Sequence, residues 1–217
     1  ITDVVAGRSM GADANIILYR RLSWLGAAGL SLALAGERSA AEDLVHSTLL
    51  EIDNLVVDGE TVAGIGIIHG KDEILHHLAV AHAHLGNFES AIAVIETMPT
   101  PWRRGQALIR LAEIILAAGS EEDAAVSVTQ RALSLIQPVA DSNVARKPSV
   151  KDFQTLVGRA AAILAAAHRT DEAAGLVADL IRTAYARIDT GEIDDFRGGV
   201  AAYLVSEASG EARSRTG

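Results

Sequence analysis

Residues 84–91 read HLGNFESA, an apolar run that stops at Gly86, with a second apolar run opening at Ala91. Glycine adopts the left-handed conformation that ends a helix at little cost, so this stretch predicts a bend between two helices. The same arrangement, a turn position followed five residues later by alanine, recurs at Gly36, Gly119 and His168. We therefore expect four helical hairpins. In the fourth, His168 must either tolerate the left-handed conformation or avoid it.

Two further positions repeat in the same register. A small residue stands seven residues before each turn position, and a β-branched residue stands nine residues after it. This is helical spacing on both sides of the turn, so we expect paired helices that approach closely at the small residues. A bulky side chain in place of Ala91 or Ala124 should overpack such a crossing. The small residues are Gly29, Ala79, Ala112 and Ala161, and the β-branched ones are Val45, Ile95, Val128 and Val177.

The repeated unit resembles the tetratricopeptide repeat (TPR), which pairs two antiparallel helices in about 34 residues. The spacings between turn positions are 50, 33 and 49 residues, so only the central pair has the family period. Leucine or valine also stands where the family has its typical Trp and Tyr. The resemblance covers roughly residues 13–190. It implies an all-α fold, a right-handed α-α superhelix (TPR-like solenoid) of about four helical hairpins plus a C-terminal helix.

These patterns divide the chain into an N-terminal tail at 1–12, a TPR-like helical repeat domain at 13–209 and a C-terminal tail at 210–217. Two insertions account for the long spacings. The glycine-rich segment 56–70 predicts a loop or a short hairpin, and 139–149 is a polar segment containing Pro148. Pro101 suits the first turn of a helix. We expect helices near 13–36, 39–55, 72–86, 88–98, 101–118, 121–137, 150–168, 171–189 and 193–208.

The composition supports a helical chain. Hydrophobic residues make up 49% of the 217 residues but aromatics only 4%, whereas a β-sandwich of this size would use more Tyr, Phe, Trp and Thr. The net charge of −9 argues against a nucleic-acid partner. The sequence has no cysteine, which rules out disulfides and thiolate metal sites and fits a reducing compartment, so we predict a cytoplasmic protein.

One segment resembles a secretory signal, because Arg20 and Arg21 precede an uncharged stretch at 22–36. This stretch is too short for a transmembrane helix and falls in the repeat register, so we interpret it as a buried helix of the solenoid and expect no membrane association. The sequence opens at Ile1, and we interpret it as part of a longer protein.

The histidines gather in one predicted helix, which holds His76, His77, His82 and His84, with His69 just before it. Two imidazoles on a helix share a metal ion when they are three or four residues apart, and no pair in this run has that spacing. We therefore expect no metal and no cofactor. His82 falls at a core position. Asp72 with His76, and Glu73 with His77, are spaced as ion pairs on a helix surface.

No motif points to catalysis, and we predict that the chain is not an enzyme and has no catalytic residue. Glu121-Glu122-Asp123 and Asp194-Asp195 stand at predicted helix starts, where negative charge favours the helix dipole. Trp102-Arg103-Arg104 is interpreted as a helix-start anchor with solvated arginines. The sequence contains no phosphate-binding glycine loop, GxSxG or HExxH motif.

The resemblance also implies where a partner binds, because the first helix of each TPR-like hairpin lines the concave surface. In the first repeat this surface would carry Ser23, Gly26 and Leu30, which is too apolar to be free and implies packing against a missing segment or a second subunit. Val80 and Ile109 share the face in the next two repeats. The partner-binding residues implied by register are Glu73, His76, His77, His84, Gln106, Arg110, Glu113 and Arg159.

The sequence thus predicts a non-enzymatic protein–protein interaction or scaffolding module that binds a protein or peptide and self-associates through its first helix. Two alternatives stay open. One is an enzyme or metal-binding protein whose site is formed by the 56–70 insertion and the helix at 72–86. The other is a solvated concave face that binds no ligand.

Overall fold

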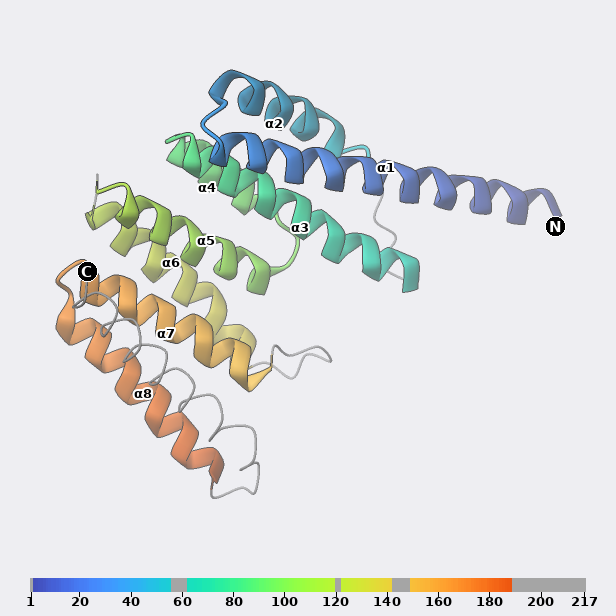
Figure 1. Cartoon of the computed structure of the whole chain (residues 1–217). Helices are drawn as coiled ribbons and strands as arrows, with labels where there is room; N and C mark the ends of the chain where they lie inside the picture. Colours follow the sequence, from blue (N-terminus) through green and yellow to red (C-terminus); the bar gives the residue numbers. More distant parts are fainter. Residues whose placement is uncertain (1, 56–61, 120–121, 142–148, 189–217) are drawn as a thin grey trace. The chain divides into compact units, whose positions relative to one another are not determined.

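The computed structural model describes residues 2–55, 62–119, 122–141 and 149–188, and these residues form eight helices and no strand (Figure 1). The predicted all-α class is confirmed for this part of the chain. Contacts divide the chain into two compact units, residues 1–114 and 115–217. The helices are α1 Thr2–Leu34, α2 Arg38–Ile52, α3 Val62–His84, α4 Phe88–Glu96, α5 Pro101–Ala117, α6 Glu122–Asp141, α7 Val150–Ala166 and α8 Thr170–Ile188.

All four predicted turn positions lie at bends between consecutive helices. The φ angles are +81° at Gly36, +80° at Gly86 and +68° at Gly119. His168 adopts the same left-handed conformation at +57°, so it tolerates the geometry that the other copies give to glycine. The predicted bends are confirmed, including the one without glycine.

The bends also share one hydrogen-bonding pattern. At the first bend the Gly36 N–H donates to the Ala33 carbonyl at 3.1 Å, and the Glu37 N–H donates to the Leu32 carbonyl at 3.0 Å. This pair of bonds is the Schellman motif, which satisfies carbonyls left open at a helix end. The second and fourth bends repeat it, with Asn87 donating to His82 at 2.9 Å and Arg169 donating to Leu164 at 2.8 Å.

The alanines that open the second helices are buried in three of the four hairpins. Ala41, Ala91 and Ala173 are buried, and each N–H donates to the carbonyl of the residue that follows the turn position. The fourth, Ala124, is only half-buried, and its neighbour Ala125 is fully buried instead. Ala91 is therefore a better position than Ala124 at which to test the close helix crossing with a bulkier side chain.

Unit 1 is built around α3. Helix α1 packs along α2 and α3, while α3 also packs against α4 and touches α2 (Figure 1). At the α1–α2 crossing, a Cβ on Gly29 would lie 3.2 Å from Cγ2 of Val45, which is tighter than ordinary contact. The two register positions thus meet, and the small residues at the equivalent sites, Ala79, Ala112 and Ala161, are all buried.

The apolar face of α1 is covered within the chain. A Cβ on Gly26 would lie 3.5 Å from Cγ2 of Ile74 on α3, so α3 packs on this part of α1. Ser23 and Leu30 on the same face are half-buried. The neighbouring hairpin thus covers this face at Gly26, while Ser23 and Leu30 keep part of their surface exposed. Packing of a missing segment or a second subunit on this face stays a prediction.

Three element boundaries differ from the prediction. Helix α1 begins at Thr2 rather than near residue 13. Helix α3 begins at Val62, so the loop or hairpin expected over 56–70 is wrong from residue 62 onward. The apolar stretch 62–69 continues the helix despite its glycines, and Gly70 is buried under the ring of Tyr19. Helix α6 likewise continues to Asp141, into the second expected insertion.

Unit 2 has the same local construction. Helix α6 packs against α7, and α7 packs against α8. Their apolar cluster joins Val126, Ala161, Leu164, Ala167 and Ala173. The predicted helix at 193–208 and the tail at 210–217 lie outside the described residues.

Candidate partner-binding face

The histidine-bearing helix α3 is mostly buried. Because three helices pack on it, its residues 74–84 are buried except at the four histidine positions. Of the predicted binding residues on α3, Glu73 and His84 are exposed and His76 and His77 are half-buried. Val80 is buried, so its predicted place on the concave surface is wrong.

His77 lies between the surface and the α1–α3 contact. A Cβ on Gly26 would be 3.7 Å from the His77 Cβ, which places this histidine against α1. Its Nδ1 atom is buried and has no hydrogen-bond partner among the described residues. The His76 and His77 ring centroids are 6.4 Å apart. His77 therefore has a packing role that a freely accessible binding residue would not have.

Helix α5 supplies a charged pair on the candidate face. Arg110 is exposed, and its Nη1 atom donates to Oε2 of Glu113 at 3.0 Å. Gln106 is half-buried and accepts a hydrogen bond from Arg103 Nη1 at 3.1 Å. Ile109 is fully buried, which corrects its predicted place on the surface.

His84 and Arg110 connect the two helices electrostatically. Partial burial lowers the pKa of His84 below its ordinary value, and the nearby Arg110 charge lowers this pKa further. The structure therefore places His84 near enough to Arg110 for the arginine charge to act on the histidine. We call His84, Gln106, Arg110 and Glu113 the α3/α5 face. Arg159, the remaining predicted residue, is half-buried on α7 in unit 2.

His82 points to a different neighbour. It is half-buried, burial lowers its pKa, and the Glu42 carboxylate on α2 partly opposes this shift. His82 thus lies near Glu42 of α2, at a half-buried site rather than at the predicted core position. At neutral pH burial favours the uncharged imidazole.

Asp72 positions the start of α5. The prediction placed Asp72 in an ion pair on the helix surface, but its side chain is buried. Its Oδ1 atom accepts a hydrogen bond from the Thr100 backbone N–H at 3.4 Å. Thr100 immediately precedes Pro101, which opens α5 as predicted. The buried carboxylate therefore holds the corner between two hairpins, which the local spacing of Asp72 and His76 did not reveal.

The other charged motifs lie where helices start. Glu122 and Asp123 occupy the first turn of α6, as predicted for charges that favour the helix dipole. Trp102, Arg103 and Arg104 lie in the first turn of α5. Residue 121 and Asp194-Asp195 lie outside the described residues.

Within the described part of the chain, no three His, Asp or Glu side chains are grouped as a metal site would require. The His69 side chain is outside that part.

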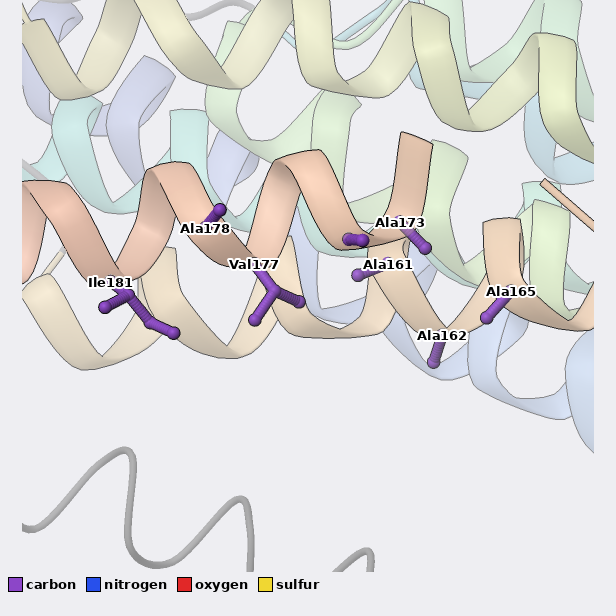
Figure 2. Close-up of a pocket in the computed structure, with 8 residues that line it drawn as sticks. Ala161, Ala162, Ala165, Ala173, Val177, Ala178 and Ile181 are labelled. Carbon is purple, nitrogen blue, oxygen red and sulfur yellow. The ribbon is translucent and has the colours of Figure 1, made fainter. Parts of the chain in front are cut away.

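Two surface features were missed by sequence reasoning. Trp24 on α1 is 80% exposed, and no pattern in its neighbourhood indicated this. A groove of about 530 Å³ lies between α7 and α8 (Figure 2). No titratable side chain lines this α7/α8 groove, and the abundance of alanine in both helices was its only sequence signal. Its lining residues are Ala161, Ala162, Ala165, Ala173, Ala174, Val177, Ala178 and Ile181.

Comparison with models of known protein families and with curated proteins gives no match. In the regions that the structure describes, no helix combines the length and apolar character needed to span a membrane.

Proposed function

We propose that the chain is a TPR-like superhelical repeat protein that acts as a non-enzymatic protein–protein interaction module. The support for the repeat is the same Schellman bend at three turn positions, together with small buried residues seven positions before each turn. Nearest-neighbour packing of helical hairpins creates extended surfaces that repeat proteins use for binding. The sequence without cysteine supports a reducing compartment, and we propose the cytoplasm.

The observation that carries the proposal is that His84 and Arg110, on two hairpins of unit 1, are both exposed and near enough for the Arg110 charge to lower the pKa of His84. The Arg110 guanidinium already holds one carboxylate, that of Glu113 on the next turn of α5. Its remaining N–H donors suit a second carboxylate from a partner. His84 adds a hydrogen-bonding group beside it. We therefore propose that the α3/α5 face binds an acidic side chain or carboxyl terminus of a protein or peptide.

A selection from a displayed peptide library on the immobilised chain tests this proposal. Peptides that bind the wild type are measured against His84→Ala/Arg110→Ala, whose substituted residues are both exposed and outside the core. Ser47→Ala/Glu89→Ala, which changes two exposed residues on α2 and α4, is the matched control. We expect acidic peptides that bind the wild type and the control but lose affinity for the face variant. Equal binding to all three proteins, with unchanged circular dichroism, would refute the proposal.

A further inference from the structure

In the described part of the chain, large apolar side chains are exposed in only two places, the first hairpin and α8. They are Ile17, Trp24 and Leu34 on α1, Leu50 on α2, and Val177 and Ile181 on α8. In a series of stacked hairpins, the first and the last have a neighbour on one side only. The α1–α2 and α7–α8 hairpins are the first and the last that the structure describes. Exposed apolar surface of this kind indicates contact with another molecule.

Two of these side chains project from one side of α1. Ile17 is 68% exposed and Trp24 is 80% exposed, and seven residues, or two helical turns, separate them by about 10 Å. Arg20 is also exposed, three residues after Ile17 and four before Trp24, so it lies on the same side. We call Ile17, Arg20 and Trp24 the outer α1 face. It differs from the face of Ser23 and Gly26, because consecutive helical residues point about 100° apart.

The α7/α8 groove has the complementary shape, with walls mostly of alanine. Val177 and Ile181 lie in it and are 38% and 43% exposed, and Figure 2 shows both on α8 with alanines of α7 beside them. The α8 residues that line the groove run from Ala173 to Ile181, about 12 Å of helix. Two projecting side chains about 10 Å apart fit within that length. Projecting side chains fill a groove, whereas two projecting faces or two grooves leave gaps, so the outer α1 face fits the groove better than either surface fits itself.

The charges at the two surfaces have opposite sign. Residues 14–36 contain Arg20 and Arg21 but no Asp or Glu, and Arg21 is held in an ion pair with α2. Residues 168–182, around the groove, contain three carboxylates and two arginines. Each of these arginines pairs with a carboxylate three residues away, which leaves the exposed Asp171 as the surplus charge. Arg20 at one surface and Asp171 at the other therefore favour association of the two.

We propose that the chain associates with itself head to tail, with the outer α1 face of one copy bound in the α7/α8 groove of a second copy. Trp24 is the main anchor, since tryptophan is among the residues that contribute most to the energy of protein interfaces. Arg20 then approaches Asp171 near the end of the groove. The contact joins two different surfaces, so each bound copy still offers one of them to a further copy. The α3/α5 face takes no part, and the proposal does not depend on the proposed partner.

Two variants that each block one surface test the proposal. Trp24→Glu places a carboxylate on the outer α1 face, and Ile181→Arg places a guanidinium in the groove. Both positions are exposed, and circular dichroism checks that the fold is kept. Leu50→Glu is the matched control, because it removes an exposed apolar side chain that belongs to neither surface. Sedimentation velocity over a range of concentrations measures the mass of the wild type, of each variant and of an equimolar mixture of the two blocked variants.

We expect the wild type and Leu50→Glu to associate as the concentration rises. Each blocked variant alone should associate at least about tenfold more weakly, because it has lost one of the two surfaces. The equimolar mixture should nevertheless form dimers and nothing larger, since the intact groove of Trp24→Glu binds the intact outer α1 face of Ile181→Arg.

Four results would overturn the proposal. They are a wild type that stays monomeric at millimolar concentration, a mixture that forms no dimer, and association that is weakened by only one of the two substitutions. Loss of association with Trp24→Glu alone would show that α1 binds α1, and loss with Ile181→Arg alone would show contact between two grooves. The fourth is a monomeric wild type that Ile181→Arg destabilises and Trp24→Glu does not, which would assign the groove to a segment of the same chain. If either variant loses its helical signal, Ile17→Glu or Val177→Arg takes its place.

Discussion

The substitution Gly86→Ala isolates the conformational requirement of a bend. A Cβ built on Gly86 has no heavy atom within 4 Å, so the methyl group meets no steric obstacle. The φ angle of +80° is nevertheless one that alanine adopts at a cost of about 1–2 kcal/mol. Alanine also lowers the conformational entropy of the unfolded chain, and this offsets about 0.4–1 kcal/mol of that cost. We expect a net loss of about 1 kcal/mol in the free energy of unfolding, or about 2–4 °C in Tm for a chain of this size.

The chain offers a control with the same chemical change and the opposite expected sign. Gly175 lies inside α8, and a Cβ there also meets nothing within 4 Å. Because alanine favours a helix interior over glycine, Gly175→Ala should gain about 0.5–1 kcal/mol. His168→Gly should also stabilise, by up to about 1 kcal/mol, since His168 holds a left-handed φ of +57° with an exposed side chain. Urea denaturation measures all three variants. If Gly86→Ala and Gly175→Ala changed stability in the same direction, the reasoning about the bends would be wrong.

Three further predictions follow from unit 1. Arg38→Ala removes a hydrogen bond from Nη2 to the Leu85 carbonyl, 2.5 Å long, and should lower the free energy of unfolding by about 0.5–1 kcal/mol in urea titrations. Gly70→Ala would put a Cβ within 2.6 Å of Tyr19 Cζ, so we expect overpacking of about 1–3 kcal/mol that Tyr19→Leu partly relieves in calorimetry. Burial lowers the pKa of His82 below 6.5, so the unfolded state takes up its proton first. Stability that is complete above about pH 6.5 should therefore fall as the pH drops below it, and His82→Gln should flatten that fall; an unchanged pH profile would contradict the assignment.

The bends were predictable because their cause is local. Glycine at Gly36, Gly86 and Gly119 relieves a backbone penalty that belongs to a single residue, and alanine five positions later opens the next helix. The fourth bend, at His168, could be predicted only by comparison with the other three copies. Repetition in one register, more than any single motif, indicated the hairpins.

The predictions that were wrong depended on contacts between residues far apart in the sequence. Gly64, Gly66 and Gly70 led us to predict a loop, because glycine has a low helix propensity. The structure instead has a helix from Val62, and the Tyr19 ring of α1 packs on Gly70 within it. The repeat register placed Val80 and Ile109 on an open surface, yet both are buried. Register fixes which residues share a helix face, but the neighbours that cover that face are set by the tertiary structure.

The candidate site was predictable only in part, for the same reason. The register placed His84 of α3 and Arg110 of α5 on one predicted surface, and the Arg110 charge does lower the pKa of His84. The role of Asp72 depends on the Thr100 N–H, 28 residues away, and spacing within one helix carries no information about it. The α7/α8 groove depends on how α7 and α8 pack against each other, so alanine content alone could not define it.

The most direct test of the repeated close crossing is an NMR measurement between Gly29 and Val45. The structure places these residues at the α1–α2 crossing, where a Cβ on Gly29 would be 3.2 Å from Val45 Cγ2. We predict a strong nuclear Overhauser effect between the Gly29 Hα protons and a Val45 methyl group. Gly29 protons that show such effects only to other residues of α1 would contradict the account.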